Sequence, residues 1–398
     1  MEVNKKETEN IFRKATNHFY YTIGNYKLID IIYGTVYIVI MVNEGLSIME
    51  MSVIFSISSF LLFIFELPSG VLADLYGRKK MIGIGLIFIA IGYLIYTVSN
   101  SFWIFLVASL FIQLGNALQS GNMSSWYYEI TDKYSLSSRR EKVFINASII
   151  VHAFGILGTL FGISMSIVGE KNLLYICIFF CLVSSVLNFF YLEDNYGRKQ
   201  EDKIFLEVYN STKQFIKDRK MNKVIIYNLA TVFIFTAFIV CWQLFVLEKL
   251  MLPESMIGVI LLTFMITMLV AQFALKIINE NFSNASTIKV SLRVIFISFL
   301  IMTISWNMAV FIVGGIIFEF ALSILLTADS IWLQEILPSE YRSSYYAAIS
   351  AINAVVGSVA TILLGFIMDY FNISLVWLIA GIVALLGSIF FSKVCGNL

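Results

Sequence analysis

The chain has 398 residues, of which 59% are hydrophobic and only 13% are charged, and its formal net charge is +1. This composition excludes an ordinary water-soluble domain and a disordered chain, because both carry far more charge. With three prolines in the whole chain, long uninterrupted helices are expected. The composition therefore predicts an all-α membrane protein.

Apolar runs long enough to cross a bilayer recur along the whole chain. About 20 apolar residues in a helix span a hydrocarbon core of about 30 Å. We expect twelve transmembrane helices, and the longest runs must tilt or extend into the cytosol. The runs cover about 28 to 48, 51 to 73, 81 to 99, 102 to 128, 143 to 168, 173 to 192, 224 to 247, 256 to 278, 287 to 305, 308 to 337, 344 to 368 and 374 to 392.

Basic residues are distributed unevenly between the two sides of the membrane. The first 26 residues carry four basic residues and lack an apolar core of their own, so we expect no cleavable signal peptide. With the N-terminus inside, 25 of the 27 Lys and Arg residues are cytosolic, and only Lys171 and Lys249 lie outside. The positive-inside rule then predicts an even number of spans with both termini in the cytosol, and we expect this multi-pass protein in the plasma membrane.

The longest polar break divides the chain into two halves of six helices, 28–192 and 224–392. The break itself, 193–223, has apolar residues at helical spacing among lysines, which predicts an amphipathic helix on the cytosolic surface. The remaining segments, 1–27 and 393–398, are expected to be cytosolic tails.

A short internal repeat relates the two halves. The sequence Trp126-Tyr-Tyr-Glu129-Ile ends the fourth run, and Trp332-Leu-Gln-Glu335-Ile ends the tenth run 206 residues later. Duplicated halves are typical of transporter folds. The repeat therefore predicts two pseudo-symmetric halves.

The polar stretch between the second and third runs carries the most specific pattern. Its two glycines allow the backbone to turn tightly, and its basic residues lie beside the lipid headgroups. The sequence from Gly70 to Lys79, Gly-x-Leu-Ala-Asp-x-x-Gly-Arg-Lys, resembles the loop 2/3 signature of the major facilitator superfamily at every position. The resemblance implies that superfamily's twelve-helix fold and a gating role for Gly70, Asp74, Gly77, Arg78 and Lys79.

Further segments extend the resemblance to both halves. Residues 337–344 look like the loop 10/11 element of the superfamily, and Trp242-Gln243 is similar to part of its helix 7/8 pattern. Two positions depart from the superfamily. Phe111 stands where helix 4 often carries an arginine, and Thr159 replaces the proline of the antiporter signature in helix 5.

No catalytic constellation is present in the sequence. It has two histidines, no zinc-protease motif, no phosphate-binding loop and no soluble domain large enough for a nucleotide site. The four cysteines, Cys177, Cys181, Cys241 and Cys395, do not lie where a disulfide or a metal site is expected. We expect no enzyme activity, no cofactor, no metal and no nucleic-acid partner. We expect instead a monomer in a lipid bilayer, with the proton gradient as its energy source.

Three ionisable residues within or near the apolar runs are candidates for coupling to protons or cations. Glu319 lies about eleven residues into the tenth run, near the midplane. It is interpreted as a proton or cation site, or as a protonated acid bonded between helices. His152 is either a packing histidine or a proton carrier. Glu66 either has a structural role, in which it snorkels to the membrane surface or pairs with a base of the loop, or takes part in coupling.

The resemblance also implies a substrate cavity, since helices 1, 4, 7 and 10 line it in the superfamily. Aromatic faces with one buried acid suit a lipophilic or cationic solute, through apolar contact and cation–π attraction. The alternative is that these aromatic residues pack or face lipid. Besides Glu319, the cavity candidates are Tyr33, Tyr37, Gln113, Asn116, Trp242 and Gln243.

These features together predict a secondary active transporter that moves a small organic solute by alternating access, with proton-coupled efflux as the first interpretation. Uptake of a nutrient such as a sugar or a peptide is the alternative. A receptor or scaffold that transports nothing is the third interpretation, because a fold does not prove a function.

The topology leads to a direct prediction. In a background that lacks the four native cysteines, Asn100→Cys should react with a membrane-impermeant thiol reagent added outside intact cells. Asn210→Cys should react only after permeabilisation, because the positive-inside rule places it in the cytosol. The reverse labelling pattern would contradict the orientation.

Overall fold

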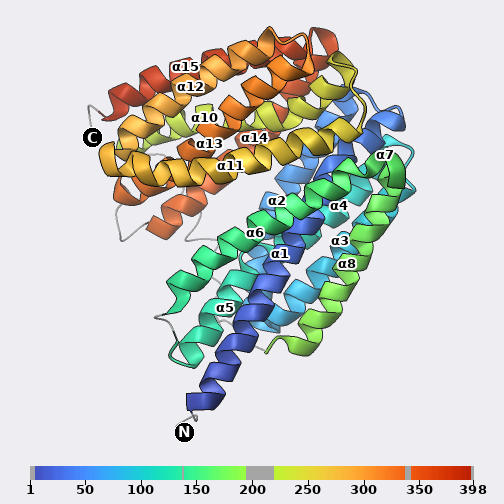
Figure 1. Cartoon of the computed structure of the whole chain (residues 1–398), viewed down its shortest axis with the longest axis vertical. Helices are drawn as coiled ribbons and strands as arrows, with labels where there is room; N and C mark the ends of the chain where they lie inside the picture. Colours follow the sequence, from blue (N-terminus) through green and yellow to red (C-terminus); the bar gives the residue numbers. More distant parts are fainter. Residues whose placement is uncertain (1–4, 137–138, 194–218, 337–341, 396–398) are drawn as a thin grey trace. The chain divides into compact units, whose positions relative to one another are not determined.

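The computed structural model describes residues 5–136, 139–193, 219–336 and 342–395, and they form an all-helical protein (Figure 1). The first half contains α1 (Lys5–Asn43), α2 (Ile48–Tyr76), α3 (Arg78–Thr97), α4 (Phe102–Gln119), α5 (Asn122–Lys133), α6 (Arg140–Ile163), α7 (Met165–Val168) and α8 (Glu170–Tyr191). The second half contains α10 (Arg219–Leu244), the π-helical turn η2 (Phe245–Lys249), α11 (Ser255–Asn281), α12 (Asn284–Thr303), α13 (Met308–Ile336), α14 (Arg342–Tyr370) and α15 (Ile373–Cys395).

Within these residues, twelve helical segments are long and apolar enough to cross a membrane. This confirms the predicted number of spans. Two spans combine neighbouring elements, since α4 and α5 form one span over Phe102–Lys133, and α10 continues into η2 over Lys223–Lys249. Most of the predicted linker, residues 194–218, lies outside the described part.

The first helix begins much earlier than the sequence predicts, at Lys5 instead of near residue 28. Polar side chains of its first half are bonded to α8 and so do not need water. Asn188 Oδ1 hydrogen-bonds to His18 Nε2 at 2.8 Å and accepts from the Thr22 hydroxyl at 3.0 Å, and Asn25 donates to the Ser184 hydroxyl. Hydropathy alone does not detect such internal pairs.

Two compact units are defined by the contacts, residues 1–46 with 58–200, and residues 47–57 with 201–398. In the first unit, α3 packs against α4 and α8, and α1 packs against α6 and α8. In the second unit, α12 packs against α13 and α15, and α10 packs against α14 and α15.

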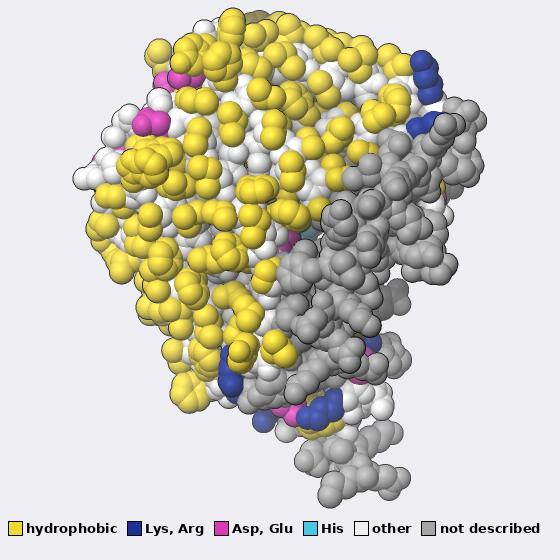
Figure 2. All heavy atoms as spheres, turned by 180° about the vertical axis from the view of Figure 1, so that it is seen from behind, with side chains coloured by type: hydrophobic (Ala, Val, Ile, Leu, Met, Phe, Trp, Pro, Cys, Tyr) yellow, Lys and Arg dark blue, Asp and Glu magenta, His cyan; other side chains and the backbone are white. Residues whose placement is uncertain are grey.

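Large apolar side chains also lie on the surface, as lipid contact requires. Trp103, Phe190 and Phe273 are among the exposed ones. Figure 2 shows one face that is largely apolar, with charged side chains near its margins. An apolar surface of this extent is not tolerated in water, so the exposed side chains support the assignment as a multi-pass membrane protein.

Glycines allow α3 and α4 to approach closely. A Cβ atom added to Gly115 would lie 2.5 Å from the carbonyl oxygen of Gly85 and 2.9 Å from the amide nitrogen of Ile89. A Cβ added to Gly92 would meet the Ala108 carbonyl oxygen at 2.9 Å. These contacts are with backbone atoms, so a side chain could enter only if the helices moved apart.

Gly115→Val should therefore lower the free energy of unfolding by about 1 to 3 kcal/mol, the usual cost of overpacking. The matched control is Gly34→Val in α1, where an added Cβ meets nothing within 4 Å. Thermal unfolding of the purified variants in detergent measures the difference. Equal stability of the two variants would show that the α3–α4 contact tolerates a side chain.

Candidate functional site

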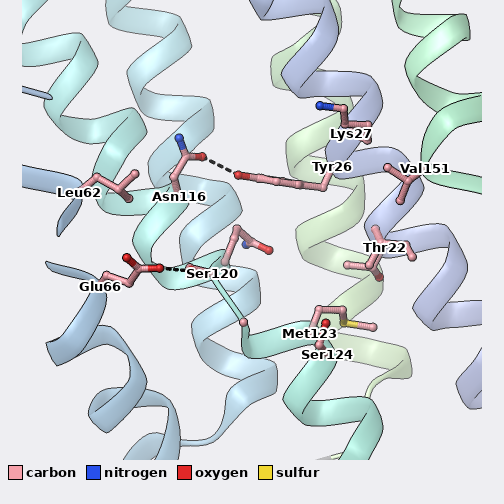
Figure 3. Close-up of a pocket in the computed structure, with 13 residues that line it drawn as sticks. Thr22, Tyr26, Lys27, Leu62, Glu66, Asn116, Ser120, Met123, Ser124 and Val151 are labelled. Carbon is pink, nitrogen blue, oxygen red and sulfur yellow. Dashed lines mark hydrogen bonds between the residues drawn. The ribbon is translucent and has the colours of Figure 1, made fainter. Parts of the chain in front are cut away.

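A pocket of about 440 Å³ lies within the first unit, between residues of α1, α2, α4, α5 and α6 (Figure 3). Its volume is in the range of sites for small organic molecules. Eight of its thirteen lining residues are polar, namely Thr22, Tyr26, Lys27, Glu66, Asn116, Gln119, Ser120 and Ser124. The pocket can therefore offer several hydrogen bonds to a solute.

Hydrogen bonds between helices hold the polar groups of this pocket in place. The Tyr26 hydroxyl donates to Asn116 Oδ1 at 2.9 Å, and Asn116 Nδ2 donates to Gln113 Oε1 at 3.1 Å. The Ser120 hydroxyl donates to Glu66 at 2.6 Å. Both the Tyr26–Asn116 bond and the Ser120–Glu66 bond are drawn in Figure 3.

The charges near the pocket sum to an excess of one acid. Lys27 Nζ lies 2.8 Å from Asp30 Oδ2, which balances its charge. Glu66 comes from α2, lies apart from Lys27 in Figure 3, and has no ion pair within the residues that the structure describes. A carboxylate left without a cation attracts a positively charged group. His152, half-buried on α6, is within electrostatic range of Lys27.

The aromatic candidates of α1 lie away from this pocket. The ring of Tyr33 is 5.3 Å from that of Tyr37 and 4.9 Å from that of Tyr93 on α3. The Tyr96 hydroxyl donates to the Tyr37 carbonyl oxygen at 2.7 Å. In this structure the two candidate rings pack α1 against α3.

The second unit contains the remaining candidates. Trp242 and Gln243 are buried on α10, and Trp242 packs edge-on against Phe264 at 5.7 Å. Glu319 on α13 is 9% exposed and has neither a hydrogen bond nor an ion pair among the described residues. Gly315, one turn before Glu319, is covered by Phe264, because an added Cβ would lie 2.5 Å from that ring. Phe264 thus packs against both Trp242 and the helical turn that precedes Glu319.

Most of the predicted gating loop is helical, since Gly70 and Asp74 belong to α2, and Arg78 and Lys79 begin α3. Only Gly77 forms the turn between the two helices. Gly77 has a φ of +96°, which favours glycine. Arg78, the next residue, donates from Nε and Nη2 to Glu129 Oε1 at 3.0 and 2.8 Å. Sequence analysis did not find this ion pair, because its partners are 51 residues apart. The Asp74 side chain lies outside the described ones.

The two halves repeat this contact at the same spacing. Asn284 is the first residue of α12, as Arg78 is of α3, and its Nδ2 donates to Glu335 Oε1 at 3.1 Å. The offsets are equal, 284 − 78 = 206 and 335 − 129 = 206. The repeated Glu of the sequence motif therefore holds the start of a helix in both halves, by an ion pair in one and by a neutral donor in the other.

Sequence analysis also overlooked Asp329, which lies ten residues after Glu319 on α13 and is 8% exposed. The sequence did offer one sign of it: Asp329 is an acid within the tenth apolar run, eight residues before the predicted end of that run. Because charged residues near the end of a run are usually interfacial, that signal was weak.

Comparison with known proteins identifies the family. The profile of the Major Facilitator Superfamily matches residues 26–248 and 224–394, so the chain belongs to this superfamily. An uncharacterised MFS-type transporter of Methanocaldococcus jannaschii is 27% identical over 192 residues, which cover 48% of this chain and 49% of that protein. An uncharacterised transporter of Buchnera aphidicola subsp. Baizongia pistaciae is 34% identical over 134 residues, 32% of this chain and 30% of that protein. The chain thus spans about half or less of these relatives.

Solved structures of the same fold cover nearly the whole chain. The nucleoside transporter NupG matches with a TM-score of 0.77 at 11% identity, covering 97% of this chain and 99% of that one. A peptide transporter POT in complex with sulfate matches with a TM-score of 0.77 at 13% identity, covering 96% and 94%. At such low identity the match shows the fold alone, and it confirms the predicted twelve-helix architecture.

The Arg78–Glu129 pair leads to a stability prediction. Arg78 is mostly buried, so Glu129→Ala should cost about 1.5 to 3 kcal/mol, the range for hydrogen bonds to charged groups. The control is Glu9→Ala, which breaks the exposed pair with Arg139 and should cost less than about 1 kcal/mol. Denaturation of both variants in detergent compares them, and an equal loss of stability would mean that burial does not strengthen the Arg78 pair.

Proposed function

We propose that the chain is a proton-driven secondary active transporter that moves a small organic solute by alternating access. The direction that we propose is export of a lipophilic or cationic compound across the plasma membrane, with both termini in the cytosol. The observation that carries this proposal is Glu319, an acid that is buried in a membrane-spanning helix and has no partner among the described residues.

A charged carboxylate at such a position is strongly disfavoured unless a cation accompanies it. Glu319 is therefore expected to hold a proton while its surroundings are dry, and to release it when water or a cationic solute reaches it. A difference in proton affinity between two states is what couples proton movement to solute movement. Phe111 stacks against Phe88 on α3, so helix 4 supplies no arginine there to take the place of the proton.

The pocket of the first unit supports a solute with a positive charge. Glu66 would attract the charge, and Tyr26 and Asn116 would orient the solute through hydrogen bonds. The fixed Arg78–Glu129 contact supports a gating role for the loop from Gly70 to Lys79. His152 would pass protons near Lys27.

Uptake of a polar nutrient is the second candidate, and the polar lining of the pocket favours it over export of a purely lipophilic compound. Two proteins of the same fold are named as a nucleoside transporter and a peptide transporter. Such solutes need the donors and acceptors that Thr22, Gln119 and Ser124 add to the pocket.

A transport screen tests the proposed function. Cells with and without the protein are compared for accumulation of lipophilic cations, nucleosides and small peptides, with and without a proton uncoupler. Export predicts lower accumulation of one compound in expressing cells and loss of the difference with the uncoupler. Uptake predicts the opposite sign. A protein that changes the accumulation of no compound in the panel would favour a receptor or scaffold.

Glu319→Gln should abolish accumulation of the identified solute against its gradient while exchange of solute for solute continues. The glutamine keeps the shape and the hydrogen bonds of the acid but cannot ionise. Reconstituted vesicles with an imposed pH gradient measure the first property, and counterflow of labelled solute measures the second. Glu9→Gln, the same change at an exposed position, is the control. A Glu319→Gln protein that still builds the normal gradient would place coupling elsewhere.

A further inference from the structure

A second buried acid lies on α13 at a place that the pocket and Glu319 do not explain. Asp329 is 8% exposed, and its Oδ1 atom is buried without a hydrogen-bond partner among the described residues. The Tyr227 hydroxyl of α10 lies near the carboxyl. Asp329 follows Glu319 by ten residues, which is about 15 Å along a helix axis, so the two carboxyls are separate sites.

The two acids also face different neighbours of α13. Ten residues at about 100° each rotate Asp329 by about 80° from the side of Glu319. Ser323, one turn after Glu319, accepts a hydrogen bond from Gln272 of α11 at 2.8 Å. Asp329 instead contacts Tyr227 of α10. The carboxyls therefore belong to two different helix contacts within the second unit.

Aromatic rings surround Tyr227, the neighbour of Asp329 on α10. The Tyr227 ring lies 4.5 Å from the Phe391 ring of α15 and 6.0 Å from the Trp332 ring of α13. Trp332 and Phe391 are 4.8 Å apart. The acid thus lies beside a cluster of rings from three helices, and these rings offer no charge to balance a carboxylate.

None of the described cations of the neighbouring helices forms an ion pair with Asp329 either. Within the described part of the chain, it forms no ion pair. The described ionisable side chains on the elements packed around it include Tyr227 and Lys223 of α10, Lys289 and Arg293 of α12, Lys393 of α15, and Glu319 and Glu335 of α13. Of these, Arg293 donates to the Ser388 hydroxyl of α15, and Glu335 accepts from Asn284.

We propose that Asp329 is a second proton-binding site of this protein. A proton bonds to the carboxylate oxygen and is released to water when the contact of α13 with α10 opens to solvent. No other bond forms or breaks. The carboxyl is neutral while Tyr227, Trp332 and Phe391 enclose it, and it becomes charged when they separate. Its part in driving transport rests on the proposed function, whereas the protonation itself does not.

Infrared difference spectroscopy of the full-length protein, reconstituted in lipid and titrated with acid and base, tests the site without any solute. Each protonated carboxyl contributes a C=O stretching band that disappears when it ionises. We expect Asp329→Asn to remove one band from the wild-type difference spectrum, and Glu319→Gln to leave that band in place. Tyr227→Phe should shift the same band to higher frequency, because the carboxyl loses its nearby polar group on α10.

Two outcomes would overturn the proposal. One is a spectrum of Asp329→Asn identical to that of the wild type. The other is a change of this band when sodium replaces potassium in the buffer at constant pH, because that would assign the site to a metal cation. If Asp329→Asn does not elute as a folded protein, Tyr227→Phe decides, since it keeps the acid and an unshifted band would contradict the assignment. Failure of transport alone would leave this result unaffected.

Discussion

The need to pair polar groups inside an apolar bundle is the constraint on which this structure depends. A polar side chain that leaves water without a partner costs several kcal/mol in hydrocarbon. Asn25, Thr22 and His18 meet this constraint by bonding to Asn188 and Ser184 of α8. The same constraint makes the acids of α13 conspicuous, because their carboxyl groups are buried and lack a balancing cation among the described residues.

The two units repeat one contact but form it with different residues. Both hold the start of a helix through the Glu of the repeated motif, by Arg78 in the first half and by Asn284 in the second. An ion pair is stronger than a hydrogen bond from a neutral donor to the same carboxylate, and it depends more on its surroundings. The first unit contains the polar pocket, and the second contains both buried acids. We propose that the first unit recognises the solute and that the acids of the second unit bind the coupling proton, with His152 of the first unit as a proton carrier.

Most of the fold could be predicted from the sequence because its signals are local. Apolar length specifies the spans, and the Gly77-Arg78 turn is specified by residues adjacent in the chain. The pocket could not be predicted, since Thr22 and Tyr26 lie in the segment that polarity assigned to a cytosolic tail. The Arg78–Glu129 pair depends on tertiary packing, and Asp329 lies too near the end of its run to be distinguished from an interfacial residue. Glu319 was found because a lone acid near the middle of an apolar run has few structural explanations.

Proton movement driven by the solute tests the central claim most directly. Vesicles containing the protein and a pH-sensitive dye are loaded with the solute identified by the screen, with no initial pH difference and with the membrane potential clamped by potassium and valinomycin. Solute leaving by exchange for protons should acidify the lumen, and solute leaving together with protons should make it alkaline. The account predicts one of these changes in the wild type and none in Glu319→Gln. Solute efflux through the wild-type protein without any change in lumenal pH would contradict proton coupling.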